Sequence, residues 1–264
     1  MTDEMLLENR DSRGVVTLTL NRPDIHNAFN DVLIGRLTER LSSLQDDPGV
    51  RAVVLAAAGR SFSAGADLNW MRSMANFSEA ENVEDALALA ELMAVLDRLA
   101  KPTIARVNGP VFGGGVGLVA CCDIAVGTPR AKMSLTEVKL GLVPAVIAPY
   151  VVRAMGPRQA RRYFQTAEVM SADKALALGL LHEIAEDEQL DERVEDLAGA
   201  LLAAGPRALA ASKELVAMTA EAGESDAESL KRRTAALIAQ LRVSAEGQEG
   251  LAAFLEKRAP QWRQ

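Results

Sequence analysis

The first half of the chain alternates short β-like segments with longer segments of helical periodicity. Residues 14–23 alternate apolar and threonine side chains, which predicts a strand with one buried face. Residues 50–59 form a continuous apolar run that ends in glycine, as is typical of a strand buried on both faces. Further strands are expected at 103–110 and 122–128, and helices at 31–44 and 83–102. This alternation predicts an α/β fold with mostly parallel strand pairing.

Beyond residue 140 the pattern becomes mainly helical, with one small strand expected near 180–185. From about residue 190 it stays helical to the end, with breaks at 203–208 and 221–229. We therefore expect a single domain, in which an α/β core covers 1–195 and a helical C-terminal region covers 196–264.

Composition excludes several classes of function. A chain of 264 residues with 49% hydrophobic residues can bury a full core. Its formal net charge of −7 argues against nucleic acid as the main ligand. No apolar run is long enough to span a membrane, and the polar, acidic start argues against a secretory signal or transit peptide. We expect a cytoplasmic protein without a membrane partner.

Few residues are available for metal, disulfide or histidine chemistry. The two cysteines, Cys121 and Cys122, are adjacent, which makes a poor disulfide and no metal-type spacing. The only histidines are His26 and His182, so a histidine base would have to be one of them. We expect no metal site and a structural role for His182.

The stretch FGGGVGLVACCD (112–123) places four glycines where a helix should begin. Glycine costs roughly 1 kcal/mol relative to alanine inside a helix, so a sharp turn or a closely approaching group must require them. The spacing is not the G-x-G-x-x-G of dinucleotide binding, and no Lys-Ser/Thr follows as in a P-loop. The segment can instead provide a backbone N–H donor at the start of a helix.

A second segment, GRSFSAGADLNWMR (59–72), follows the buried strand and is rich in small residues. Asp67 can cap a following helix, whose free N–H groups favour negative charge. The segment is equally compatible with a tight turn that binds nothing. Two N–H donors from separate loops would make an oxyanion hole, in which each donor contributes about 3 to 4 kcal/mol to transition-state stabilisation.

A third segment, MSLTEVKLGLVP (133–144), carries Glu137 between apolar residues. Gly141 and Pro144 turn the chain sharply there, so the carboxylate is a candidate for partial desolvation. Desolvation would raise its pKa and suit it to acid/base catalysis. The alternative is an exposed glutamate on a loop.

Five segments together resemble the crotonase family of enoyl-CoA hydratases and isomerases. They are LNRPDIHNAFN (20–30), SFSAGADL (61–68), VNGPVFGGGVGLVACCDIAV (107–126), TEVKLGLVP (136–144) and EGLAAFLEKRAPQW (249–262). The resemblance implies a crotonase-like spiral of ββα repeats with a C-terminal helical region that builds trimers, often paired into hexamers. It also implies an acyl-coenzyme A thioester as substrate and no separate cofactor.

The resemblance also assigns the catalytic positions. The oxyanion hole corresponds to the N–H groups of Ala66 and Gly114, and a catalytic carboxylate to Glu137. The other carboxylate of typical hydratases falls at Gly117, which has no side chain. Glu137 alone could pass a proton from water to the α-carbon during hydration, or move one between the α- and γ-carbons during isomerisation.

Further positions are expected to contact substrate or coenzyme. By resemblance these are His26, Ala64, Asp67, Leu68, Phe254 and Lys257, the last two from a neighbouring subunit. The segments GADLNWMR, GGGVGLVACCDIAV and EVKLGLVPAVIAPYVVRAMG are similar to those of bacterial hydratases of 3-methylglutaconyl-CoA and its isohexenyl relative, an activity of leucine or acyclic-terpene degradation.

A substrate of this kind carries a distal carboxylate, for which Arg72, Lys139 and Arg153 are candidate partners. Three alternatives to hydration remain open at this point. They are a Δ3,Δ2-isomerase, a hydrolase that uses Ser134 or another nucleophile, and an acyl-CoA binder without hydratase activity.

Overall fold

The core is built on a six-stranded sheet in a computed structural model that describes residues 5–222 and 226–263. The strand order is β1-β2-β3-β4-β6-β9, and every neighbouring pair is parallel except β1 with β2. The strands are β1 (Leu6–Arg10), β2 (Val15–Leu20), β3 (Ala52–Ala57), β4 (Thr103–Val107), β6 (Ile124–Gly127) and β9 (Glu183–Ile184). The predicted α/β class with mostly parallel pairing is confirmed.

A second, smaller sheet holds β5 (Val111–Phe112), β7 (Lys132–Ser134) and β8 (Met170–Ser171) in the order β5-β7-β8. Two isolated parallel bridges, Phe29 with Ala66 and Ser63 with Val111, continue its pairing into earlier segments. Each turn of the chain thus adds a strand to the first sheet and then a short extended segment to the second. This is the spiral of ββα repeats that the resemblance implied.

Helices α1 (Asp31–Gln45), α3 (Glu79–Arg98) and α4 (Gly114–Cys121) bury the main core against one face of the large sheet. Leucines at helical spacing in α1, among them Leu37 and Leu41, are fully buried there. The other face is covered in part by α8 (Leu190–Leu202), whose Val194 and Ala198 pack in one buried cluster with Val54 and Ile104.

Two local features differ from the sequence expectation. Helix α3 begins at Glu79 rather than 83, because Ser78 and Glu81 form a reciprocal capping box at its start. Strand β1 was not predicted, because most of its residues are exposed at the sheet edge and show no alternation. In its antiparallel pairing with β2, Leu6 lies opposite Leu20 and Arg10 lies opposite Val16. No pattern in the sequence of β1 itself indicates this register.

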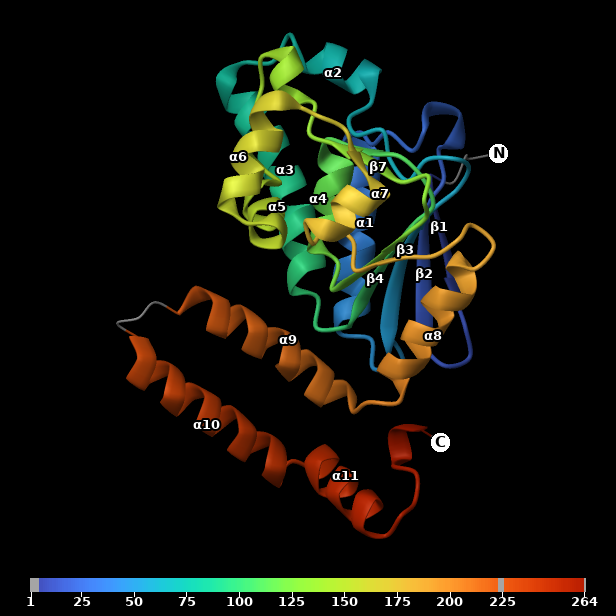
Figure 1. Cartoon of the computed structure of the whole chain (residues 1–264), viewed down its shortest axis with the longest axis vertical. Coiled ribbons are helices and arrows are strands. Elements are labelled where there is room, and N and C mark those ends of the chain that lie inside the picture. The colour runs from blue at the N-terminus through green and yellow to red at the C-terminus, as the bar shows by residue number, and fades with distance from the viewer. Residues whose placement is uncertain (1–4, 223–225, 264) are drawn as a thin grey trace.

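Shorter helices surround the second sheet. They are η1 (Pro23–Ile25), α2 (Leu68–Met74), η2 (Glu137–Leu140), α5 (Ala148–Met155), α6 (Pro157–Thr166) and α7 (Ala172–Ala177). In Figure 1, α2 lies at one end of the molecule, above the sheets.

The last helices leave the core at the opposite end from α2 and form an arm (Figure 1). The arm consists of α9 (Pro206–Glu221), α10 (Ala227–Val243), α11 (Ala245–Leu255) and η4 (Gln261–Arg263). The expected boundary at 195/196 falls inside α8, which packs on the sheet, so the helical extension begins after it.

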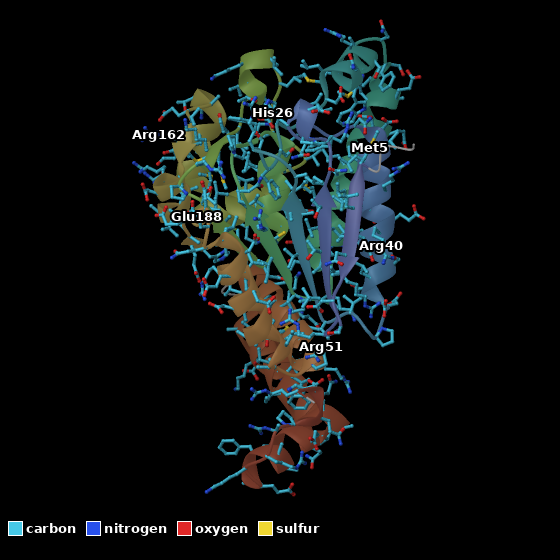
Figure 2. All side chains as sticks on the ribbon, turned by 90° about the vertical axis from the view of Figure 1, so that its right-hand side faces the viewer. Met5, His26, Arg40, Arg51, Arg162 and Glu188 are labelled. Atoms are coloured by element: carbon cyan, nitrogen blue, oxygen red, sulfur yellow. The ribbon has the colours of Figure 1, made fainter. Side chains whose placement is uncertain are left out.

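Arg51 lies where the arm meets the core and forms hydrogen bonds to both (Figure 2). Its guanidinium donates to the carbonyl oxygens of Trp262 at 3.1 Å, Leu202 at 3.2 Å and Ala204 at 3.1 Å. The end of the chain is thereby tied to the end of α8. Over the part of the chain that is described, no helix combines the length and apolarity that crossing a bilayer requires.

Candidate active site

The three segments that the sequence singled out meet beside the second sheet. A Cβ built on Gly65 would lie 3.7 Å from the Gly113 Cα, and one built on Gly113 would lie 3.3 Å from Glu137 Oε1. Backbone hydrogen bonds from Phe112 N–H to Ser63 O (2.9 Å) and from Gly113 N–H to Ser134 O (3.0 Å) hold the segments side by side. The spiral therefore brings residues that are 24 to 72 positions apart in sequence into one site.

The glycine-rich stretch is explained by protein atoms that approach it closely. Gly113 has a φ of +51°, a backbone conformation that residues with a Cβ rarely adopt. A Cβ on Gly114 would lie 2.4 Å from Phe29 Cζ, and one on Gly117 would lie 2.2 Å from Ile147 Cγ2. The approaching groups are thus side chains of the protein, and a bound thioester is not needed to account for these glycines.

Ala66 presents its N–H away from its β-bridge partner. Phe29 N–H donates to Gly65 O and Asp67 N–H donates to Phe29 O, both at 2.9 Å. Since alternate peptide groups of an extended segment point to opposite sides, the Ala66 N–H between them points to the other side. Within residues 5–222 and 226–263, no hydrogen-bond acceptor is found for it.

Gly114 is the first residue of α4, so its N–H has no acceptor inside the helix. The partial positive charge of a helix N-terminus also favours a developing negative charge there. Because a Cβ built on Gly65 would touch the Gly113 Cα at 3.7 Å, the N–H groups of Ala66 and Gly114 lie on neighbouring stretches of backbone. An oxyanion hole requires two such donors, so the assignment of Ala66 and Gly114 to it stays a prediction.

Glu137 opens η2 and is partly buried. Its Oε2 atom is buried and finds no hydrogen-bond partner in the described chain. Burial raises the pKa of this carboxyl group, and only a hydrogen bond to its own backbone acts in the opposite direction. A buried carboxylate without a cationic partner is suited to accept and return a proton.

The space beside Gly117 is filled. Besides Ile147 Cγ2, a Cβ at this position would meet Ile147 Cβ at 2.8 Å and Met93 Cε at 3.2 Å. Apolar side chains therefore occupy the space beside Gly117, where the resemblance places the other glutamate of typical hydratases.

The three other predicted contact residues of the 61–68 segment differ in their exposure to solvent. Ala64 and Leu68 are exposed on either side of Ala66, and Leu68 is 70% exposed. Asp67 is buried instead: its Oδ1 accepts from Asn69 N–H at 2.8 Å and its Oδ2 from Arg22 at 2.7 Å. The predicted capping of the following helix by Asp67 is confirmed.

His26 lies near the end of the molecule opposite to the arm (Figure 2). Its Nδ1 is 3.0 Å from Ser61 Oγ and its Nε2 is 3.3 Å from an Arg60 nitrogen. His26 has a φ of +54°, which the loop after β2 imposes. A coenzyme contact by this residue stays a prediction.

Phe254 and Lys257 lie in and just after α11, a helix at the opposite end of the molecule from α2 (Figure 1). Phe254 is 81% exposed. The structure does not bring these two residues to Glu137 of the same chain. A contact between them and the coenzyme stays a prediction.

The three candidate cations do not share one location. Arg72 is exposed in α2, the helix that begins two residues after Ala66. Lys139 is exposed in η2, the short helix that begins with Glu137. Arg153 is ion-paired with Asp97, stacks on Tyr150 at 5.5 Å, and lines a cavity of about 660 Å³ between the core and α9. That cavity contains neither Glu137 nor the two donor N–H groups.

Ser134 and His182 have structural partners. Ser134 is fully buried and donates to Ala167 O at 3.0 Å, so its hydroxyl is not presented as a nucleophile. His182 Nδ1 accepts from Ala125 N–H at 3.0 Å, in line with the structural role expected for it.

Two residues of the site were not found from the sequence. The Phe29 ring packs on Gly114 and lies 6.5 Å from the Trp70 ring at a tilt of 55°. Arg22 reaches Asp67 across 45 positions of sequence. Neither contact has a local sequence signal, because each depends on how the spiral stacks its turns.

Comparison with known proteins gives a consistent result along the whole chain. A family model described as enoyl-CoA hydratase/isomerase matches residues 10–264. The chain is 31% identical to a crotonyl-CoA hydratase of Syntrophomonas wolfei, over 97% of its own length and 96% of the relative's. It is also 31% identical to a 2,3-dehydroadipyl-CoA hydratase of Escherichia coli, over 98% of each chain. Among solved structures, an enoyl-CoA hydratase from Shewanella pealeana superposes with a TM-score of 0.94 at 45% identity, covering 99% of this chain and 97% of the other.

Proposed function

The chain belongs to the enoyl-CoA hydratase/isomerase family, and from this premise we propose that it adds water to a branched enoyl-CoA thioester. The observation that carries the proposal is the buried, unpartnered Oε2 of Glu137 beside the free N–H groups of Ala66 and Gly114. These groups supply a base and an oxyanion hole, which conjugate addition to a thioester needs.

In the proposed reaction, the thioester carbonyl oxygen accepts hydrogen bonds from Ala66 and Gly114. Glu137 takes a proton from water while the water oxygen forms a bond to the β-carbon. The electron pair of the double bond moves to the α-carbon and the carbonyl oxygen, where the two N–H donors stabilise the enolate. Glu137 then gives its proton to the α-carbon, so the carboxylate is restored and a 3-hydroxyacyl thioester is released.

A single carboxylate performs both proton transfers in this scheme. Ile147 and Met93 fill the place beside Gly117, so a second glutamate cannot orient the water from there. One group can serve twice because its pKa is raised by burial, which brings the basicity of the carboxylate closer to the working pH.

For the substrate, we propose 3-methylglutaconyl-CoA or a related branched enoyl-CoA with a distal carboxylate. Support comes from the likeness of segments 65–72 and 137–156 to bacterial hydratases of that substrate. A further relative is named for 2,3-dehydroadipyl-CoA, whose acyl group also ends in a carboxylate. Lys139 and Arg72 are the exposed cations on η2 and α2 that could meet such a group.

The proposal is tested by product analysis in ¹⁸O-labelled water. The purified protein receives 3-methylglutaconyl-CoA, crotonyl-CoA or a 3-enoyl-CoA in separate reactions. Hydration yields a 3-hydroxyacyl product that carries the label, with preference for the carboxylated substrate. Conversion of the 3-enoyl to the 2-enoyl thioester without label would instead assign a Δ3,Δ2-isomerase, for which the single carboxylate is equally suited.

We also propose that the arm makes contacts between copies of the chain. Large apolar side chains are more than half exposed on it, namely Val216, Val243, Leu251, Phe254 and Leu255. Apolar surface of this extent on three helices is usual where another protein surface covers it. Such packing would allow Phe254 and Lys257 to reach the coenzyme bound by a neighbour.

A further inference from the structure

Arg22 lies in the loop that follows β2, and its side chain is only 15% exposed. We infer that Arg22 is a positioning residue, which holds together the two segments that form the bridge at Ala66 and thereby fixes the direction of the Ala66 N–H. The inference rests on the proposed function, because it concerns the N–H group that would receive the thioester oxygen.

The Ala66 N–H gets its direction from the peptide groups beside it. Hydrogen bonds of 2.9 Å join Phe29 N–H to Gly65 O and Asp67 N–H to Phe29 O. Ala66 stands between these two bonds in a bridge only one residue long. Since no longer ladder supports it, the bridge depends on what holds the segments 28–29 and 65–67 together.

The guanidinium of Arg22 spans these two segments. Its Nη1 donates to Ala28 O at 2.6 Å, and its Nη2 donates to Asp67 Oδ2 at 2.7 Å. Ala28 precedes Phe29 on one side of the bridge, and Asp67 follows Ala66 on the other. One planar group therefore connects both sides of the bridge that orients the oxyanion donor.

Arg22 is itself fixed to its loop. Its backbone N–H donates to Asn27 Oδ1 at 2.8 Å, and Asn27 N–H donates back to Arg22 O at 2.9 Å. Asn27 is fully buried and also donates to the carbonyl oxygens of Ala58 and Ser61, both at 2.8 Å. The position of the guanidinium is thus set by the end of β3 as well as by its own loop.

The charge on Asp67 supports this arrangement. Burial acts to raise the pKa of Asp67, but hydrogen bonds from Asn69 N–H and Arg22 outweigh it, so the pKa is lowered. Asp67 therefore stays ionised opposite the guanidinium. Lysine could neutralise it but could not donate in the same two fixed directions, because its ammonium is a point charge without a planar fork.

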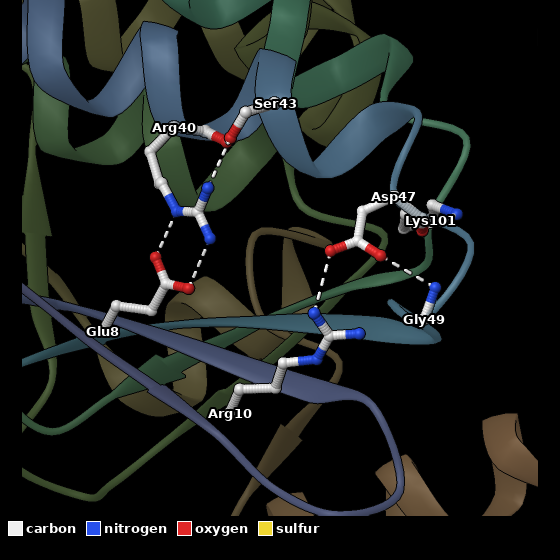
Figure 3. A network of polar contacts seen from close by, with 7 residues as sticks. All are labelled: Glu8, Arg10, Arg40, Ser43, Asp47, Gly49 and Lys101. Atoms are coloured by element: carbon white, nitrogen blue, oxygen red, sulfur yellow. Dashed lines mark hydrogen bonds and ion pairs between the residues drawn. The ribbon is translucent and has the colours of Figure 1, made fainter.

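The test uses Arg22→Lys, which keeps the charge, and Arg22→Met, which removes it. Arg40→Met is the matched control: Arg40 also forms a two-pronged ion pair, with Glu8 of β1, on a different surface of the core (Figure 3). For each protein we would measure Tm, kcat and KM for the preferred enoyl-CoA, the Kd of a saturated acyl-CoA, and amide hydrogen exchange at Phe29 and Asp67. If Arg22→Met fails to fold, Arg22→Lys carries the test.

Removal of one oxyanion donor costs about 10²- to 10³-fold in kcat, so a misdirected donor should cost less than that. We expect Arg22→Lys to lower kcat by about 10-fold or more, with KM and the Kd of the saturated thioester changed by less than about threefold. Exchange at Phe29 and Asp67 should accelerate, and Arg40→Met should change none of these quantities. A role in stability alone would lower Tm without separating kcat from KM.

The inference is overturned if Arg22→Lys keeps kcat within about twofold of the parent, or if exchange at Phe29 and Asp67 is not accelerated. Failure of the proposed function is a separate outcome. In that case the unaltered protein hydrates none of the enoyl thioesters, and the exchange measurement alone decides whether Arg22 holds the two segments.

Discussion

Ile147 fills the space beside Gly117, so that a Cβ at residue 117 would lie 2.2 Å from Ile147 Cγ2 and 2.8 Å from Ile147 Cβ. Ile147 is 2% exposed and Gly117 belongs to the buried helix α4, so neither side can yield easily. This contact leaves no room at residue 117 for the glutamate that the resemblance to typical hydratases places there.

The first prediction concerns the Gly117–Ile147 contact. Gly117→Ala should lower the free energy of unfolding by about 1 to 3 kcal/mol, as overpacking of a buried core does. Gly35→Ala in α1 is the control, because a Cβ there meets nothing within 4 Å. That change should raise the free energy of unfolding by up to about 1 kcal/mol, since alanine favours a helix more than glycine does. Urea unfolding curves would measure both, and equal shifts for the two variants would argue against a filled space.

The second prediction follows from the buried carboxylate of Glu137. A pKa raised by burial means that the folded state disfavours the charged form, so stability is lost as pH rises through the raised pKa. Glu137→Gln, which is always neutral, should therefore melt at a higher temperature than the parent at pH 7 to 8. The difference should shrink as pH falls toward the ordinary glutamate value of 4.5. A Glu137→Gln variant that melts lower than the parent at pH 8 would show that the carboxylate has a stabilising partner.

The third prediction is the pH dependence of catalysis. Glu137 must be ionised to take a proton from water, so kcat/KM should fall as the solution is acidified through the pKa of this residue. Because burial raises that pKa, the fall should be centred above pH 4.5. Initial rates between pH 4.5 and 9, within the range where the protein stays folded, would locate it. A rate that is flat down to pH 4.5 would remove Glu137 from the role of base.

The fourth prediction concerns the arm. Light scattering should give a mass that is a multiple of the 28.2 kDa chain. Replacing Leu255, which is 78% exposed, by glutamate should lower that mass, because a charge would be buried between copies. Glu192→Gln, at an exposed position of α8 in the core, is the control and should leave the mass unchanged. A parent protein of 28.2 kDa in solution would contradict the packing proposed for the arm.

The sequence was sufficient for the elements whose pattern reflects their burial. The continuous apolar run of β3 and the leucine stripe of α1 are both buried as predicted, and Asn30 caps α1 through Leu33 N–H. The partial burial of the Glu137 carboxyl group and its raised pKa could also be predicted, because the neighbouring residues in the sequence are apolar.

The sequence could not show contacts that depend on how successive turns stack. Arg22 with Asp67, Phe29 on Gly114 and Ile147 beside Gly117 each join residues 30 to 85 positions apart. The side chains that approach Gly114 and Gly117 could not be identified from the sequence, since they lie on other turns. Strand β1 was missed because an exposed edge strand carries little hydrophobic pattern.

The most direct measurement is kcat for the parent protein and for Glu137→Gln on the same enoyl-CoA, together with the Kd of its saturated analogue. The account predicts labelled 3-hydroxyacyl product from the parent, a loss of about 10²- to 10⁴-fold in kcat on substitution, and an unchanged Kd. A Glu137→Gln variant that retains the parent's kcat would contradict the claim that this single carboxylate carries the reaction.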